Sequence, residues 1–373
     1  MMKKICVLFT IPNFDTAGSG KALLNLALGL DANRFEPHIL CLNKKGEFFE
    51  TVLKSSIPVH VFDYLPKERP TWKMLLSCYK VAQKIKEINP DVVHSFHYSS
   101  NYTEAFAVKL AGKKWIFTKK NMSWGGSSKN SWKLRSWFAD KIIIQNTDMK
   151  KEFYPTSTKT VLIPRGVNTK KFQPEIPNSE ILKQMNTTNA ERIVICVANF
   201  VPVKGIELLI EAFCQLNSLF PQWKLWLVGD DTNEYGKEIK KKVKDLSMTE
   251  KIIFSGKVNN VNDYLQHAEI FVLPTKDEGR KEGSPVAMLE AMANGKVVIG
   301  SAISGIKDQL QNFPNHLFKP GNSEDLKNKL ELFFSNSQSE NVHLGKQFIN
   351  EVSLYYSIQD EVVKHEKAYL SLF

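Results

Sequence analysis

The chain is predicted to be an α/β protein with two Rossmann-like domains, on three observations. Its 373 residues exceed the usual size of one compact domain. Apolar runs of strand length alternate with helical patterns, as in parallel sheets covered by helices. The alternation stops near residues 165–190, where Pro164, Pro174 and Pro177 precede a polar run at 186–189, and then restarts.

The first domain is expected to cover residues 1–175. It begins with an apolar run that stops at Pro12 and Asn13, which is typical of a buried strand and too short for a signal peptide. Helical patterns follow at 22–30, 72–88 and 102–110, with a further short helix at 131–138. The strands are expected at 4–9, 36–42, 59–61, 92–95, 115–118 and 141–145.

The second domain is expected to cover residues 176–345, followed by a helical tail at 346–373 that is interrupted near Ser357. Its helices are expected at 205–219, 238–246, 261–266 and 285–293, and its strands at 192–198, 224–228, 251–255, 270–273 and 297–300. Ligands of such sheets bind at the carboxyl ends of the strands, so chemistry is expected on the loops that follow them.

The composition indicates a globular protein of a reducing compartment. Charged residues make up 24% and hydrophobic residues 43% of the chain, and no apolar run reaches the length that spans a bilayer. The five cysteines show neither metal-ligand nor redox spacing, so free thiols and a cytoplasmic location are expected.

Positive charge is concentrated in the first half. Residues 109–171 hold 15 Lys and Arg against 3 Asp and Glu, interleaved with tryptophans. This pattern predicts a peripheral contact with an anionic membrane, at the inner face of the plasma membrane. A solvated basic face is the alternative, and no nucleic-acid module is visible. The predicted membrane surface uses Lys113, Lys114, Lys119, Lys120, Lys129, Lys133 and Arg135 with Trp132 and Trp137.

The most informative segment follows the strand at 270–273. A polar loop leads to a helix that opens near Ser284 and Pro285, where serine can cap and proline is favoured. Backbone amides at this start, those of Gly283, Ser284 and Val286 around Pro285, are predicted to hold a phosphate. Glu282 in the loop and Glu290 within the apolar helix suit hydrogen bonds to sugar and ribose hydroxyls. A buried carboxylate without a partner is costly, so Glu290 among apolar neighbours is expected to have a ligand as its partner.

This segment resembles glycosyltransferase family 4, of group 1 type. The resemblance rests on E-G-S-P at 282–285, L-E-A-M-A-N-G-K-V-V-I-G at 289–300, and weaker matches at 161–168, 227–230 and 254–258. It implies a GT-B fold, with two Rossmann-like domains facing each other across a cleft and the tail packed back on the first domain. It further implies Glu282 beside the donor sugar, Glu290 on the ribose, and Gly256 and Val258 among the donor-binding residues.

A second motif follows the strand at 192–198. Lys204 opens a helix, where its charge adds to the positive end of the helix dipole and suits a diphosphate. The family pattern has an arginine where Asn199 stands, so Asn199 is counted in the donor site without that charge. Either Arg280 or Lys281 is the expected replacement cation.

Two further motifs lie in the first domain. Gly18 and Gly20 fit the family's glycine-rich loop, expected between the first strand and helix, and the segment fails the P-loop pattern. A flexible turn is the alternative. His97 follows the strand at 92–95 and is the expected contact to the donor sugar, whereas His94 is expected to support the strand end.

The resemblance therefore predicts a retaining glycosyltransferase. It would move a hexose or N-acetylhexosamine from a nucleotide sugar, with UDP favoured, to a lipid-linked or polysaccharide acceptor of a capsule, exopolysaccharide, O-antigen or teichoic acid. Neither a cofactor nor a metal is expected. A nucleotide-sugar epimerase of the same fold and a non-catalytic nucleotide-sugar-binding partner subunit are the alternatives.

Overall fold

A computed structural model describes residues 3–15, 17–46, 48–124, 129–279 and 282–373. Contacts between Cα atoms divide the chain into two compact units. The first comprises the residues up to Pro164 together with Ile358–Phe373, and the second comprises Arg165–Ser357. Each unit contains one sheet of parallel strands with helices on both faces, so the predicted α/β class with two Rossmann-like sheets is confirmed.

In the part of the first unit that is described, seven strands form a sheet in the order β3-β2-β1-β4-β5-β6-β7. The strands are β1 (Ile5–Ile11), β2 (Phe35–Cys41), β3 (Val59–Val61), β4 (Val92–Ser95), β5 (Lys114–Lys119), β6 (Lys141–Ile144) and β7 (Thr160–Leu162). The helices are α1 (Ala17–Gly29), α2 (Phe49–Leu53), α3 (Thr71–Ile88), α4 (Thr103–Leu110), α5 (Lys129–Phe138), α6 (Thr147–Phe153) and α15 (Ile358–Leu370).

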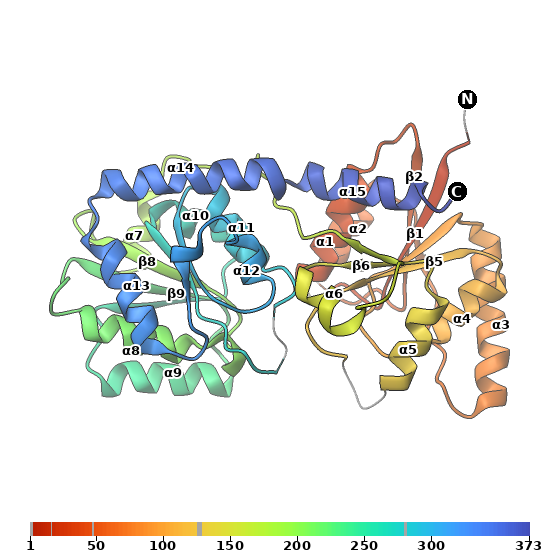
Figure 1. Ribbon diagram of the computed structural model, residues 1–373, viewed down its shortest axis with the longest axis horizontal. Helices are drawn as coiled ribbons and strands as arrows, with labels where there is room; N and C mark the ends of the chain where they lie inside the picture. The colour runs from red at the N-terminus through yellow and green to blue at the C-terminus, as the bar shows by residue number, and fades with distance from the viewer. Residues whose placement is uncertain (1–2, 16, 47, 125–128, 280–281) are drawn as a thin grey trace. The chain divides into compact units, whose positions relative to one another are not determined.

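Alternate residues of each strand point to opposite faces of this sheet. On β1, Val7 and Phe9 pack in the core formed with α1, α2 and α15, whereas Leu8 packs in the core formed with α3, α4 and α5. The second group of helices is visible in orange and yellow in Figure 1. From α15, Tyr369 is fully buried in the first of these cores, and its hydroxyl lies 2.8 Å from Nδ1 of His94.

In the described part of the second unit, six strands form a sheet in the order β10-β9-β8-β11-β12-β13. The strands are β8 (Arg192–Val197), β9 (Trp223–Val228), β10 (Ile252–Gly256), β11 (Ile270–Leu273), β12 (Val297–Ser301) and β13 (Leu317–Phe318). The helical elements are α7 (Ser179–Gln184), η1 (Pro202–Lys204), α8 (Ile206–Leu216), α9 (Glu234–Asp245), α10 (Val261–His267), α11 (Val286–Ala293), α12 (Ile306–Gln309), η2 (Pro314–His316), α13 (Ser323–Ser335) and α14 (Gln338–Tyr355).

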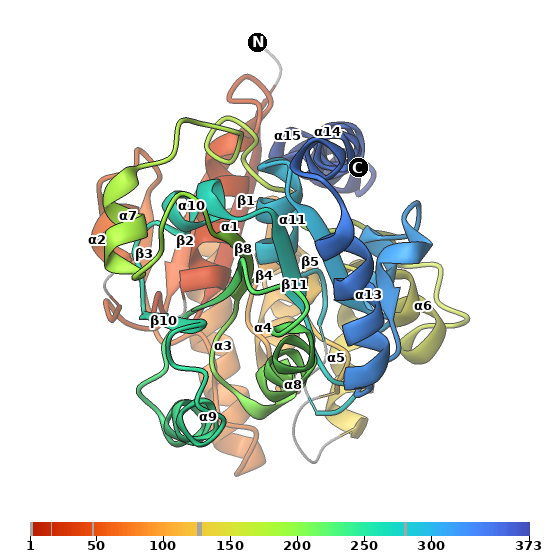
Figure 2. The same ribbon diagram turned by 90° about the vertical axis from the view of Figure 1, so that its left-hand side faces the viewer.

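The same alternation divides the core of the second unit. On β8, Ile193 and Ile195 pack with α7, α10, α11 and α14, whereas Val194 and Cys196 pack with α8, α9 and α13. Both views show α8 and α9 on one face of the strands and α10, α11 and α14 on the other (Figures 1 and 2). Because helices cover the two faces of the sheet, the carboxyl ends of the strands are followed by loops.

One predicted helix boundary is wrong, and one predicted interruption is confirmed. Helix α1 begins at Ala17, five residues earlier than expected, so Gly18 and Gly20 lie in its first turn rather than in a loop. The helical tail is interrupted as predicted, with α14 ending at Tyr355 and α15 beginning at Ile358. No helix within the described residues has the length and apolarity needed to cross a bilayer.

Candidate functional site

The strand order of the second sheet reverses between β8 and β11. These neighbours pair in parallel, with Val194 opposite Ile270, and the later strands are added outward on each side of the pair. In sheets of this kind the loops that leave such a pair of strands diverge, and ligands bind at their carboxyl ends. Residues that follow β8 and β11 are the first candidates for a ligand site in this unit.

Two residues predicted to bind different parts of a donor meet at this point. Lys204 ends the single turn η1 after β8, and Glu282 lies in the loop after β11. Lys204 Nζ and Glu282 Oε1 form an ion pair, with 21% and 15% of the side chains exposed. The hydroxyl of buried Thr275 donates to the same carboxylate oxygen over 3.4 Å. Both side chains thus reach the surface, although most of their area is shielded from solvent.

Close backbone packing fixes Lys204 in this place. The amide of Lys276 donates to the carbonyl of Val203 over 2.8 Å. Gly205 follows with a φ of +64°, and a Cβ there would lie 2.3 Å from the carbonyl oxygen of Pro274. Only glycine fits both the left-handed backbone and this contact. The turn after β8 is therefore held directly against the end of β11.

The start of α11 differs from the predicted cap. The N-cap is Pro285, with no side-chain hydrogen bond to the first turn. The Ser284 hydroxyl oxygen instead accepts from the amide of Arg165 at 3.1 Å and from Gln309 Nε2 at 3.0 Å. Ser284 thus holds the loop in position, and the expected capping role was wrong. Gly283 is buried and Val286 half-buried beside it.

Glu290 lies on the least covered face of α11. Met288, Leu289, Ala291 and Met292 are fully buried, as the apolar sequence predicts, whereas Glu290 is half-buried. Val286 is also half-buried and lies one turn before Glu290, on the same side of the helix. This face therefore runs from the first turn of α11 to the Glu290 carboxylate.

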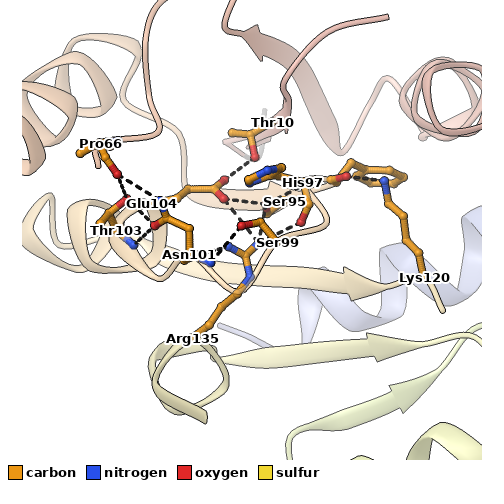
Figure 3. A network of polar contacts seen from close by, with 11 residues as sticks. Thr10, Pro66, Ser95, His97, Ser99, Asn101, Thr103, Glu104, Lys120 and Arg135 are labelled. Carbon is orange, nitrogen blue, oxygen red and sulfur yellow. Dashed lines mark hydrogen bonds and ion pairs between the residues drawn. The ribbon is translucent and has the colours of Figure 1, made fainter. Parts of the chain in front are cut away.

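In the first unit the strand order reverses between β1 and β4, with Thr10 opposite Ser95. A buried polar network lies at this point (Figure 3). Glu104 from α4, 1% exposed, accepts hydrogen bonds from the Thr10 and Ser95 hydroxyls, the second at 2.7 Å. Arg135 from α5, 0% exposed, pairs with Glu104 at 3.5 Å.

Arg135 also holds the segment after β4. Its guanidinium donates to the carbonyls of Asn101 at 2.7 Å and His97 at 3.2 Å (Figure 3). His97 Nδ1 is buried without a hydrogen-bond partner among the described residues. Burial, with the positive charges of Arg135 and Lys120, lowers the pKa of His97 to about 3. The imidazole is therefore neutral near pH 7 and able to hydrogen-bond an uncharged hydroxyl.

Two family sequence profiles match the chain in succession. The profile described as "Glycosyltransferase Family 4" matches residues 16–171, and "Glycosyl transferases group 1" matches residues 178–350. The chain belongs to glycosyltransferase family 4. The match of both halves in this order agrees with the two parallel sheets of the GT-B fold, and the family makes the chain a transferase.

Named relatives of this glycosyltransferase act in glycan synthesis. A lipopolysaccharide core mannosyltransferase from Rhizobium meliloti is 28% identical over 40% of the chain and 42% of its own length. A UDP-Gal:α-D-GlcNAc-diphosphoundecaprenol α-1,3-galactosyltransferase from Escherichia coli is 28% identical over 65% of each chain. HepE from Anabaena, crystallised with UDP and glucose, superposes with a TM-score of 0.82 at 19% identity over 98% of this chain and 99% of its own.

The remaining predicted donor residues of the glycosyltransferase lie in several places. Asn199 is exposed directly after β8, whereas Gly256 ends β10 and Val258 follows it, two strands away from β8. Gly20 lies in α1, where a Cβ would approach the Phe14 ring within 2.8 Å, whereas a Cβ on Gly18 would meet nothing within 4 Å. Arg280 and Lys281, the expected replacement cations, lie outside the described residues.

Sequence reasoning missed Lys276, a cation beside the Lys204 turn. Its Nζ forms ion pairs with Glu207 and Glu278, each at 2.9 Å. Burial alone would lower the pKa of Lys276, but the hydrogen bonds to these two carboxylates outweigh it and raise the pKa. Its place three residues after the end of β11 was the available signal, because loops after switch-point strands carry ligand groups.

The predicted membrane surface at 113–138 was wrong in composition. Lys119 and Arg135 are fully buried, and Trp132 is 1% exposed. Lys119 Nζ donates to the carbonyls of Asn121 and Ser123, and it lies 4.0 Å from the Phe153 ring centroid. Cation–π contacts and hydrogen bonds thus place these cations in the core. Lys133 and Trp137 of the predicted set are exposed.

Proposed function

We propose that the chain is a retaining glycosyltransferase that moves a hexose or N-acetylhexosamine from a UDP-sugar to a lipid-linked or polysaccharide acceptor of a cell-surface glycan. The observation that carries this proposal is the Lys204–Glu282 ion pair at the β8–β11 switch point. The pair offers a cation for a diphosphate and a carboxylate for sugar hydroxyls. The UDP complex of HepE and the names of the relatives support the choice of donor and acceptor.

Each donor group has a proposed partner. Lys204 neutralises the diphosphate together with amides of Gly283 and of the first turn of α11, which no side chain caps. Glu290 accepts hydrogen bonds from the ribose hydroxyls, and Glu282 accepts them from the donor sugar. In the first unit, neutral His97 is proposed as the sugar-contacting residue. Lys204 and the amides supply the positive charge in this scheme, without a metal.

The proposed chemistry keeps the anomeric configuration. The bond between the anomeric carbon and the β-phosphate oxygen breaks, and its electron pair leaves with UDP. The acceptor oxygen bonds to the anomeric carbon on the same face, and the acceptor proton passes to the departing phosphate oxygen. Charge builds up on that phosphate, so a fixed cation lowers the barrier by stabilising it.

The acceptor is proposed to lie at a membrane, with the enzyme bound peripherally to the bilayer surface. One relative is named for a diphosphoundecaprenol-linked acceptor, and another is named for lipopolysaccharide core biosynthesis. An acceptor with a lipid tail stays in the bilayer, so the enzyme has to approach that surface. The net charge of +11 favours approach to anionic lipid.

Calorimetric titration and a donor screen test this function. We expect UDP to bind at least tenfold more tightly than GDP, and one UDP-sugar to be hydrolysed slowly without acceptor. Labelled sugar supplied with membranes should then appear in lipid extract or in polysaccharide. Failure of every nucleoside diphosphate to bind would overturn the proposal. Isomerisation of a UDP-sugar without acceptor would indicate an epimerase instead.

A further inference from the structure

Helix α3 in the first unit carries two apolar stripes, of which the unit covers only one. The covered stripe packs in the core and consists of Met74, Cys78, Val81, Ala82 and Ile85. The second stripe consists of Trp72, Leu75, Leu76 and Tyr79, with 61%, 47%, 58% and 60% of each residue exposed. Their i, i+3, i+4, i+7 spacing places them on one face. Single exposed hydrophobic residues are ordinary, but four on one helix face form a patch.

Unpaired cations lie beside this stripe. The segment that leads into α3 and the helix itself line an open cavity of about 670 Å³. Lys67, Arg69, Lys73 and Lys80 contribute to its lining, against the single carboxylate of Asp63. All four cations are exposed, and none forms an ion pair with any residue that the structure describes. Lys84, farther along α3, pairs with Glu87 at 2.8 Å.

The two features are arranged as on an interfacial helix. Lys73 and Lys80 are two turns apart and lie roughly 100° around the helix from the Trp72–Tyr79 stripe. The Lys73 Nζ lies 5.2 Å from the Trp72 ring centroid. Cations of this kind hold lipid phosphates while aromatic and aliphatic side chains enter the headgroup region.

We propose that this α3 patch, defined as Lys67, Arg69, Trp72, Lys73, Leu75, Leu76, Tyr79 and Lys80, binds the surface of an anionic phospholipid bilayer. The cavity cations take the phosphates of lipid headgroups, and Trp72 and Tyr79 lie at headgroup depth. Positive charge next to apolar surface selects a bilayer over a soluble anion, which would leave the stripe uncovered. The inference rests on the membrane part of the proposed function, and it replaces the buried residues of 113–138 with exposed ones.

The test is co-sedimentation of the full chain with vesicles. One set contains phosphatidylcholine alone, and the other contains phosphatidylcholine and phosphatidylglycerol in equal parts. The charge variant carries Lys67→Gln, Arg69→Gln, Lys73→Gln and Lys80→Gln. The matched control removes the same charge from exposed lysines of the second unit, through Lys237→Gln, Lys241→Gln, Lys244→Gln and Lys346→Gln.

We expect the wild type to bind only the vesicles that contain phosphatidylglycerol. The charge variant should lose about three orders of magnitude in partition coefficient, whereas the control should lose less than about threefold. A second variant, Trp72→Ser with Tyr79→Ser, should also bind more weakly while keeping its thermal unfolding midpoint, because both residues are exposed. Each variant should retain wild-type UDP affinity, so this test does not depend on the donor site.

Four results would overturn the inference. The first is wild-type binding that does not depend on lipid charge, or no wild-type binding to either set of vesicles. The second is retained binding by the charge variant. The third is full displacement by inorganic phosphate at matched ionic strength, which would assign the cavity to soluble anions. The fourth is a wild-type dimer that the Trp72 and Tyr79 variant converts to monomer, which would assign the stripe to a second copy of the chain.

Discussion

Lys204 and Glu282, which are 78 residues apart in the chain, form an ion pair where β8 and β11 lie side by side. Any diphosphate that binds Lys204 has to compete with this carboxylate. The residue that the family pattern assigns to the sugar therefore pairs with the cation that we propose for the phosphate. If Lys204 binds the diphosphate as proposed, donor binding exchanges its partner.

Lys204→Ala should weaken UDP binding by about 1.5–3 kcal/mol, the usual contribution of a charge-assisted hydrogen bond. Glu282→Gln should leave UDP affinity unchanged or higher, because the competing charge is gone, yet it should lower turnover. Calorimetry with UDP and a transfer assay separate the two effects. Lys244→Ala, on exposed α9, is the control. Equal UDP affinity in Lys204→Ala and the control would remove Lys204 from the phosphate site.

Glu290→Ala should lower UDP affinity by about 1.5–3 kcal/mol, because a ribose hydroxyl loses a charged acceptor. The same substitution should have a much smaller effect on ribose-deoxygenated UDP analogues. Titrating UDP, its 2′-deoxy and its 3′-deoxy analogue against wild type and variant forms a cycle that isolates this contact. An equal loss for all three ligands would show that Glu290 acts on the stability of α11 instead.

Gly205→Ala should destabilise the second unit by more than about 1 kcal/mol. The new Cβ would meet the Pro274 carbonyl at 2.3 Å, and the φ of +64° is unfavourable for alanine. UDP affinity should fall as well, because Lys204 shifts. Gly18→Ala is the contrasting change, since a Cβ there meets nothing within 4 Å and alanine favours a helix. Thermal unfolding of both variants checks the prediction, and a stable Gly205→Ala would contradict it.

His97 should make the folded enzyme less stable in acid. Its pKa is about 3 in the fold and near 6.5 when unfolded, so the unfolded chain binds the extra proton between these values. The free energy of unfolding therefore falls as pH drops below about 6.5. His97→Gln should remove about 2 kcal/mol of this loss between pH 6.5 and 4.5. Urea unfolding at both pH values measures it, with the exposed His343→Gln as control.

Lys119 should make the free energy of unfolding depend on pH above neutrality. Burial lowers its pKa from 10.5 to about 7, with a smaller opposing effect of Glu152, so above pH 7 the unfolded chain holds more protons than the fold. Stability should rise with pH across this window. Between pH 7 and 9, the wild type should gain roughly 2 kcal/mol relative to Lys119→Met. Parallel pH slopes for the two proteins would show that the buried amine does not titrate there.

The sequence predicted most of the buried parallel strands because their apolar runs are bounded by turn residues. Two short edge strands, Leu317–Phe318 and Thr160–Leu162, escaped prediction, although the equally short edge strand Val59–Val61 was predicted. The start of α1 was misplaced because glycines suggest a loop, whereas contact with the Phe14 ring favours glycine at position 20 within a helix. Tertiary contact decided this boundary rather than local propensity.

Lys204 and Glu282 could be selected as candidates from the sequence because each follows a predicted strand, and the structure places those two strands at the switch point. The errors in the predicted membrane surface concerned two buried cations, Lys119 and Arg135. Lys119 lies two and four residues after Phe117 and Trp115, on the same inward face of β5, and that alternation was the signal that counting charges ignored. In α3, both apolar stripes look alike in the sequence. Only the structure distinguishes the covered stripe from the exposed one.

The division of the first unit between both ends of the chain has a consequence for synthesis. Helix α15 contributes Val362 and Tyr369 to the core that holds Phe9 and Phe35. The ribosome releases these last residues only after the whole of Arg165–Ser357 has been made. The second unit can thus complete its fold during translation, while the first keeps an open core until α15 has been made. A nascent chain stalled before Ile358 would expose that apolar surface to chaperones and proteases, even though the second unit had already formed.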